Sequence, residues 1–252
     1  IRESILKQIY ADCGVGLLLS GGVDSSLILS IAKEEGLDLP SFSVFETSNK
    51  GERKRAEWLT GKYSSHHSIL EVNEHLLYDF QDYVNRLDQP IADSAGILTY
   101  KICQQAVGRV KVLLSGAGAD ELFAGYNRHL AYYYYLKHQK HLLFLKKIIS
   151  PGITAFGQKA GIASFFTNME ENKKTTFFNY ISSHFTHLRS SYRLPDDIQD
   201  GIEHDYFEWA LQHDRNNYLP EDVLLISDMM SMQAGIEMRM PFLDNDLVDF
   251  AM

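Results

Sequence analysis

The sequence predicts an α/β fold, a doubly wound parallel sheet with helices on both faces, followed by a C-terminal helical part. Two observations predict this class. Short apolar runs alternate with segments of helical periodicity from residue 2 to residue 115, which is the pattern of consecutive βα units. After about residue 126 the strand signals stop and aromatic-rich helical segments follow. We therefore expect an α/β core over residues 1–125 and a helical part over residues 126–252.

Each element of the core has its own signal. Residues 2–11 form a short amphipathic pattern, which predicts a helix. The run GVGLLLS at residues 14–20 is apolar and too short for a helix, so it suits a buried parallel strand. The next helix is expected over residues 25–36, with Ser at its start and Gly at its end. Further strands are expected at 41–45, 68–72 and 110–115, and further helices at 53–63, 74–87 and 95–107.

The composition narrows the class of protein. A formal net charge of −9 argues against a nucleic-acid-binding surface, because phosphate contacts need clustered Lys and Arg. No apolar run approaches the roughly 18 residues of a membrane-spanning helix, and no charged-then-apolar leader opens the chain, so we expect a cytoplasmic protein. Cys13 and Cys103 lack metal-ligand spacing and have apolar neighbours, which predicts buried, inert thiols. The tyrosine run at 132–135 has no interleaved basic residues, which favours packing over base stacking.

The most informative motif is SGGVDSS at residues 20–26, between the first predicted strand and its helix. A glycine pair lets backbone amides approach an anion, and the helix N-terminus adds further N–H groups. Asp24 fits beside phosphate when it holds Mg²⁺, which bridges the two negative groups. The alternative is a tight turn with Ser25 as a helix cap, but glycines, hydroxyls and an acid at one junction favour a phosphate site. Its expected phosphate-binding residues are Ser20, Gly21, Gly22, Ser25 and Ser26.

A second junction of the same design lies at LLSGAGADELFAGY, residues 113–126. If the two strands are neighbours, both turns face one crevice at the carboxyl edge of the sheet. Asp120 then stands opposite Asp24, and the two carboxylates can share a Mg²⁺ ion. Glu121 is placed as a further polar contact or base. The alternative is that Asp120 and Glu121 are first-turn acids favoured by the helix dipole.

The sequence resembles the synthetase domain of the glutamine-hydrolysing asparagine synthetases, and residues 20–26 resemble the SGGxDS loop of the N-type ATP pyrophosphatases. No lysine follows the glycines, which argues against the usual γ-phosphoryl transfer. The resemblance implies the adenine nucleotide α-hydrolase-like fold. It rests on GVGLLLSGGVDSSL at 14–27, FSVF at 42–45, PIADSAGILTY at 90–100, LLSGAGADELFAGY at 113–126 and LPEDVLLISDMMSMQAGIEMRMPFLD at 219–244.

The resemblance also implies a reaction and its ligands, ATP and Mg²⁺. In that family the side-chain carboxylate of aspartate attacks ATP, pyrophosphate leaves, and ammonia then displaces AMP to give asparagine. Ammonia comes from an N-terminal glutaminase domain, which this chain lacks and which we expect as a partner in a longer parent. A homodimer is left open. The implied roles are an adenosine pocket of Leu19, Val44, Ser115 and Gly116, metal binding by Asp24 and Asp120, and a catalytic set of Asp24, Asp120 and Glu121.

Two departures from the family pattern limit the expected activity. Ala117 stands where the family has an acid, and the family's catalytic lysine would fall beyond Met252. We therefore expect this chain to bind ATP weakly and to turn over poorly. Two other functions stay open. One is a β-lactam-synthetase-like amide former, in which an internal amine replaces ammonia, and the other is a nucleotide-binding module that has lost catalysis.

Five further polar residues have two interpretations each. Asp93 and Ser94 either contact substrate or cap the helix at 95–107, and capping is favoured. Glu237, Arg239 and Asp244 fall near the crevice by analogy with the family, or form an ion-pair network that closes a helix onto the sheet.

Overall fold

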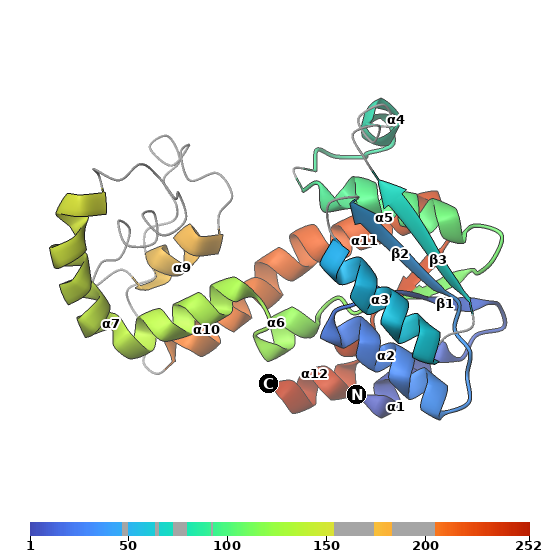
Figure 1. Cartoon of the computed structure of the whole chain (residues 1–252), viewed down its shortest axis with the longest axis horizontal. Coiled ribbons are helices and arrows are strands. Elements are labelled where there is room, and N and C mark those ends of the chain that lie inside the picture. Colours follow the sequence, from blue (N-terminus) through green and yellow to red (C-terminus); the bar gives the residue numbers. More distant parts are fainter. Residues whose placement is uncertain (47–49, 64–65, 73–79, 92, 154–173, 183–204) are drawn as a thin grey trace. The chain divides into compact units, whose positions relative to one another are not determined.

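The computed structural model describes residues 1–46, 50–63, 66–72, 80–91, 93–153, 174–182 and 205–252. The chain separates into two compact units. The first comprises Ile1–Phe123 and Asn217–Met252, and it contains a sheet with its helices (Figure 1). The second comprises Ala124–Asn216, and its described residues are mainly helical.

The sheet of the first unit is parallel throughout and has the order β3-β2-β1-β4-β5. In its centre, Gly16 of β1 pairs with Leu113 of β4, and Leu17 pairs with Leu114. The order reverses between β1 and β4, and such a reversal opens a crevice at the carboxyl ends of the two strands. The strands are β1 (Val15–Leu18), β2 (Ser41–Glu46), β3 (His67–Val72), β4 (Val112–Leu114) and β5 (Glu237–Arg239).

Helices cover both faces of this sheet, as the sequence predicts (Figure 1). Leu17 and Leu114 face one core, which also contains Ile5 of α1 (Arg2–Ile9), Ile28 of α2 (Val23–Glu34) and Ala56 of α3 (Lys50–Tyr63). The alternate positions Phe42 and Leu113 face a second core, with Ile102 and Cys103 of α5 (Ala95–Ala106). Successive residues of a strand point to opposite faces, so short apolar runs such as residues 15–18 supply both cores. The prediction of a doubly wound α/β fold is confirmed.

The carboxyl-terminal part of the chain differs from the expected helical part. Residues 217–252 belong to the sheet unit, and Glu237–Arg239 forms its fifth strand beside β4. This strand carries one apolar residue between two charged ones, so it lacks the apolar run by which the other strands were recognised. The remaining elements of this unit are α4 (Phe80–Asn85), α6 (Ala119–Phe123), α11 (Leu225–Gln233), the 3₁₀ turn η4 (Pro241–Leu243) and α12 (Asn245–Ala251).

The second unit is built around aromatic side chains. Its helices are α7 (Asn127–Ile153), α9 (Lys174–Ser182) and α10 (Tyr206–His213). The π-helical segment η3 (Asp214–Leu224) begins directly after α10, and from Asn217 onward it belongs to the first unit. Tyr132 and Tyr135 are fully buried against Phe177 and Phe178. Two of the four residues in the tyrosine run therefore pack as expected, while Tyr133 and Tyr134 on the same helix are exposed.

The two cysteines differ in burial. Cys103 lies in the core between α5 and the sheet, and burial raises the pKa of its thiol to about 12. Cys13 is exposed, so the prediction that both thiols are buried is wrong for Cys13. It lies outside every regular element, in the connection between α1 and β1, where apolar sequence neighbours do not cover it. Within the described ranges, no helix is long and apolar enough to cross a membrane.

Candidate active site

A cavity of about 370 Å³ lies at the carboxyl ends of β1 and β4. Residues of both predicted turns line this cavity, so the two junctions face one crevice. The neighbouring strand β2 contributes Val44, and α5 closes one side. The lining residues are Leu18, Leu19, Ser20, Asp24, Ser25, Val44, Ala95, Leu98, Thr99, Ile102, Ser115, Gly116, Ala117 and Asp120.

The first turn follows β1 and leads into α2. Gly21 has φ +78°, a left-handed conformation that favours glycine, and a Cβ there would lie 3.0 Å from the backbone oxygen of Glu52. Ser20 Oγ accepts a hydrogen bond from the backbone N–H of Gly22 at 3.2 Å and lies 3.1 Å from Ser25 Oγ. Within the turn, the serine hydroxyls are thus gathered at the N-terminus of α2, where N–H groups and the helix dipole favour an anion.

The second turn, between β4 and α6, repeats the arrangement. Ser115 Oγ accepts a hydrogen bond from the backbone N–H of Ala117, two residues later, at 3.2 Å. In the first turn, Ser20 Oγ accepts the N–H of Gly22 in the same way. The two turns are in close contact, because a Cβ on Gly116 would lie 3.1 Å from Asp24 Cβ and 3.2 Å from Ser25 N. Glycine at position 116 is therefore what lets the second turn approach the first.

The cavity is lined by two carboxylates, those of Asp24 and Asp120. The pKa of Asp24 is raised, first because burial disfavours its ionised form and second because Asp120 places a like charge nearby. No ion pair neutralises either carboxylate within the described part of the chain. The same part contains no cluster of three or more His, Cys, Asp or Glu side chains that could hold a metal. Two carboxylates, with phosphate oxygens and water as the other ligands, fit the way proteins bind Mg²⁺.

The structure separates the predicted site residues into three groups. Eight of them line the cavity: Leu19, Ser20, Asp24, Ser25, Val44, Ser115, Gly116 and Asp120. Gly21, Gly22 and Ser26 line a second hollow, on the side of the first turn that faces α3. Glu121 is fully buried and is not among the described residues that line either hollow.

The wall supplied by α5 was not predicted from sequence. Ala95, Leu98 and Thr99 lie in the first half of this helix and line the cavity. The available signal was the helical pattern of residues 95–107, whose spacing places residues 95, 98, 99 and 102 on one face. Asp93 caps the helix, since its Oδ1 accepts the N–H of Ala95 at 2.7 Å. Ser94 makes no side-chain capping bond, so the capping interpretation holds for Asp93 alone.

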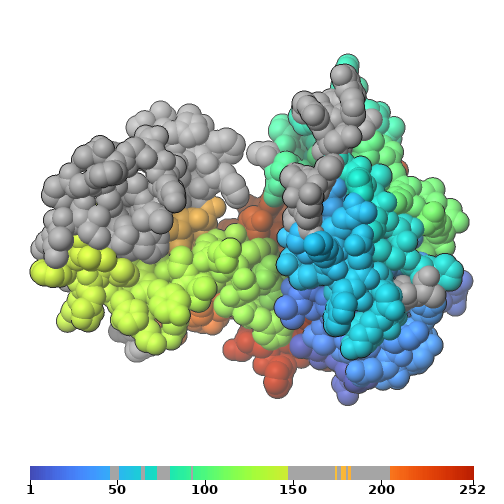
Figure 2. Space-filling model, in the orientation of Figure 1, coloured from blue at the N-terminus to red at the C-terminus, as the bar shows by residue number. Residues whose placement is uncertain are grey.

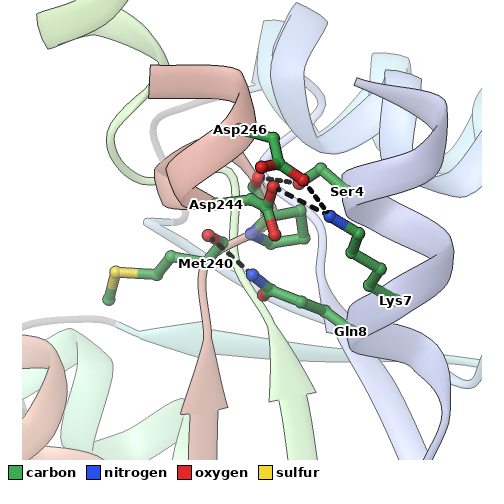
Figure 3. Close-up of polar contacts among 7 residues, drawn as sticks. Ser4, Lys7, Gln8, Met240, Asp244 and Asp246 are labelled. Carbon is green, nitrogen blue, oxygen red and sulfur yellow. Dashed lines mark hydrogen bonds and ion pairs between the residues drawn. The ribbon is translucent and has the colours of Figure 1, made fainter. Parts of the chain in front are cut away.

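The three residues near the end of the family motif form a structural network. Arg239 Nε donates to Glu237 at 2.7 Å, and its Nη1 donates to the backbone oxygens of Gln8 and Tyr10 at 2.8 and 2.9 Å. Asp244 pairs with Lys7 of α1 at 3.5 Å, and Asp246 contacts the same ammonium (Figure 3). In the same close-up, Ser4 donates to the backbone oxygen of Pro241 and Gln8 donates to that of Met240. These contacts join α1 and the residue after it to β5 and to the segment that follows β5, which supports the ion-pair interpretation.

The fold and the cavity define a doubly wound α/β protein, with a hydroxyl-rich turn and two carboxylates at its topological switch point. The particular family follows from comparison with known proteins. The family model for "Asparagine synthase" matches residues 1–252, and the chain belongs to that family.

Two curated relatives are asparagine synthetases. The chain is 29% identical over 271 residues to asparagine synthetase [glutamine-hydrolyzing] 1 of Bacillus subtilis, covering 100% of this chain and 42% of that protein. It is 27% identical over 263 residues to a putative asparagine synthetase [glutamine-hydrolyzing] of Mycobacterium tuberculosis (strain H37Rv), covering 98% and 40%. The chain thus spans about two fifths of the length of these curated relatives. Among solved structures, an NH3-dependent NAD synthetase from Campylobacter jejuni in complex with nitrate covers 77% of this chain and 95% of its own, with a TM-score of 0.38 and 16% identity.

Proposed function

We propose that this chain is the ligase domain of an asparagine synthetase, which uses ATP and Mg²⁺ to activate the side-chain carboxylate of aspartate. The observation that carries the proposal is the meeting of Asp24 and Asp120 in one cavity beside the serines of the first turn. Carboxylates next to an anion site are hard to explain without a bridging cation. Membership of the asparagine synthase family supports the choice of reaction.

In the first step, a carboxylate oxygen of aspartate attacks the α-phosphorus of ATP. The bond from that phosphorus to the bridging oxygen breaks, and pyrophosphate leaves with the electron pair. The first turn holds the outer phosphates through backbone N–H groups and the hydroxyls of Ser20, Ser25 and Ser26. Asp24 and Asp120 are the residues that would hold Mg²⁺, which when bound neutralises charge on the phosphates. The apolar side chains of Val44 and Leu98 provide a surface for adenosine.

In the second step, the nitrogen of ammonia attacks the activated acyl carbon, and the carbon–oxygen bond to AMP breaks. The ammonium formed in this attack must lose a proton. Asp24 and Asp120 are the titratable side chains among the described cavity residues, and Ala117 beside them offers none. Because Asp24 and Asp120 are taken up by Mg²⁺ binding, none of the described cavity residues serves as the base in this step. A glutaminase domain that delivers ammonia is proposed as the partner of this chain in a longer protein.

The position of bond cleavage tests the proposal directly. The chain would be incubated with aspartate, ammonia, Mg²⁺ and one of two ATP analogues. With β,γ-imido-ATP, AMP is expected to form, because the α–β bridge is an ordinary oxygen. With α,β-methylene-ATP, no AMP is expected. Release of ADP from ATP in an aspartate-dependent reaction would refute attack at the α-phosphorus. Glutamate in place of aspartate is the control for the acceptor acid.

A second candidate is a nucleotide-binding module without catalysis. It is favoured by Ala117, an apolar residue that lines the same cavity as Asp24 and Asp120. This candidate predicts that Mg²⁺-dependent ATP binding persists while no aspartate-dependent AMP appears. Restoring a carboxylate with Ala117→Glu separates the two, since AMP formation that appears only in this variant would indicate a site that has lost its chemistry.

A further inference from the structure

The proposed phosphate site lacks a positive side chain. The described residues that line the cavity include two aspartates and no Lys, Arg or His. A triphosphate that binds one magnesium ion still carries net negative charge, and the two carboxylates add to it. A cation within reach of the outer phosphates would offset this repulsion. The helix α3 packs on the outside of the first turn and carries such a cation, Arg55.

Arg55 of α3 lies against the first turn. A Cβ on Gly21 would lie 3.2 Å from the backbone nitrogen of Ala56 and 3.4 Å from Arg55 Cβ, so turn and helix are in direct contact. Arg55 also lines a hollow of about 470 Å³ together with Gly21, Gly22 and Ser26. These three are the predicted phosphate-binding residues that do not line the main cavity. The hollow therefore adjoins the first turn on the side of α3.

The guanidinium of Arg55 lies toward the N-terminal end of α3. A Cβ on Gly51, four residues earlier, would lie 3.9 Å from Arg55 Nη1, so the side chain folds back along α3 toward its N-terminus, as side chains on helices usually do. A helix that follows a parallel strand begins at the carboxyl edge of the sheet. The folded-back side chain thus lies at the edge of the sheet that carries the first turn.

The charge of Arg55 is not used elsewhere in the described chain. No hydrogen bond or ion pair of its guanidinium is present there, and its side chain is exposed. Its neighbours on α3 differ: Arg53 pairs with Glu57 at 2.8 Å and also with Glu71, and Lys62 lies over the ring of Tyr63 at 4.9 Å. The helix itself is uncovered on the face shown in Figure 2, where it is coloured blue to cyan.

We propose that Arg55 binds the outer phosphates of the nucleotide and the pyrophosphate that is released from it. This inference rests on the proposed function, because it needs a triphosphate in the first turn. Arginine is suited to the role, since its planar guanidinium donates two parallel hydrogen bonds to one phosphate group. Arg55 would supply the positive charge that a lysine supplies in the GxxxxGK[ST] loop, but from a helix beside the loop.

The experiment compares two ligands by titration calorimetry on the 252-residue chain. Magnesium pyrophosphate contains the outer phosphates, whereas AMP contains only the inner one. Arg55→Ala is expected to weaken pyrophosphate binding about tenfold or more, as expected for loss of a charge-assisted hydrogen bond, and to change AMP binding less than twofold. Arg55→Lys, which keeps the charge but not the paired donors, is expected to fall between. Lys54→Ala, the neighbouring exposed cation that does not line the hollow, is the matched control and is expected to change neither affinity.

Three results would overturn the inference. Arg55→Ala could leave pyrophosphate binding within twofold of the parent chain, or it could weaken AMP and pyrophosphate equally, which indicates a structural effect on the turn. Lys54→Ala could weaken pyrophosphate binding as much as Arg55→Ala does, which indicates a diffuse effect of net charge. If the parent chain binds neither ligand, the proposed function fails together with this inference. If the parent binds both and the Arg55 variants match it, only the inference fails.

Discussion

A single methyl group at position 116 tests the contact between the two turns. In Gly116→Ala, the new Cβ would lie 3.1 Å from Asp24 Cβ and 3.2 Å from Ser25 N. Ordinary carbon–carbon contact is about 3.5–4.0 Å, so one turn must move by roughly 0.4 Å or more. Overpacking of this kind typically costs about 1–3 kcal/mol. For a chain of this length, each kcal/mol corresponds to about 2–4 °C in melting temperature.

The displaced residues are those proposed to bind Mg²⁺ and phosphate, so affinity should fall together with stability. We expect Gly116→Ala to melt at least about 2 °C lower and to bind ATP with Mg²⁺ about tenfold more weakly, measured by thermal melts and calorimetry. The matched control is Gly61→Ala in α3, where an added Cβ has nothing within 4 Å. Its free energy of unfolding should rise by about 0.5–1 kcal/mol because alanine has the higher helix propensity, and its affinity for ATP with Mg²⁺ should not change. A Gly116→Ala variant with unchanged melting and unchanged affinity would refute the close approach of the two turns.

Three other predictions concern charge, packing and reactivity. Asp120→Asn should lower the pKa of Asp24, because it removes the nearby like charge, and an NMR titration of the Asp24 carboxyl would check this. Since folding raises that pKa, the stability from protonated Asp24 is present at low pH and is lost as the pH rises from about 4 through the raised value; the variant should show a flatter pH dependence of unfolding. Gly96→Ala would put a Cβ 2.1 Å from Tyr83 Oη and should lower the free energy of unfolding by about 1–3 kcal/mol. Adding Tyr83→Phe removes that oxygen and should restore part of the loss; a Gly96→Ala/Tyr83→Phe variant no more stable than Gly96→Ala contradicts this. Cys103, with a pKa of about 12, should resist a thiol reagent until the chain is unfolded, and rapid reaction of both thiols in the folded chain would count against its burial.

The alternation of strands and helices in the described part of residues 2–115 could be predicted from the sequence, as could the two glycine junctions that line the cavity. The first part of the helix predicted at 74–87 lies outside the described residues. The alternation and the junctions are both local properties. A strand that is buried on both faces is mostly apolar, as in residues 14–20, and an anion turn needs glycines and hydroxyls at neighbouring positions. The five-residue spacing from Ser20 to Ser25 is enough to bring their hydroxyls within 3.1 Å, so this half of the site could be predicted without the fold.

Three other features depend on contacts between segments that are distant in sequence. Only the pairing of β1 with β4 brings Asp24 and Asp120 into one cavity, because it joins residues as distant in sequence as Leu17 and Leu114. Consecutive residues of a helix point about 100° apart, so packing alone decided that Asp120 faces the cavity while Glu121 is buried. The fifth strand could not be predicted from the sequence either, because it has no apolar run of its own. It is stabilised by pairing with its neighbour β4.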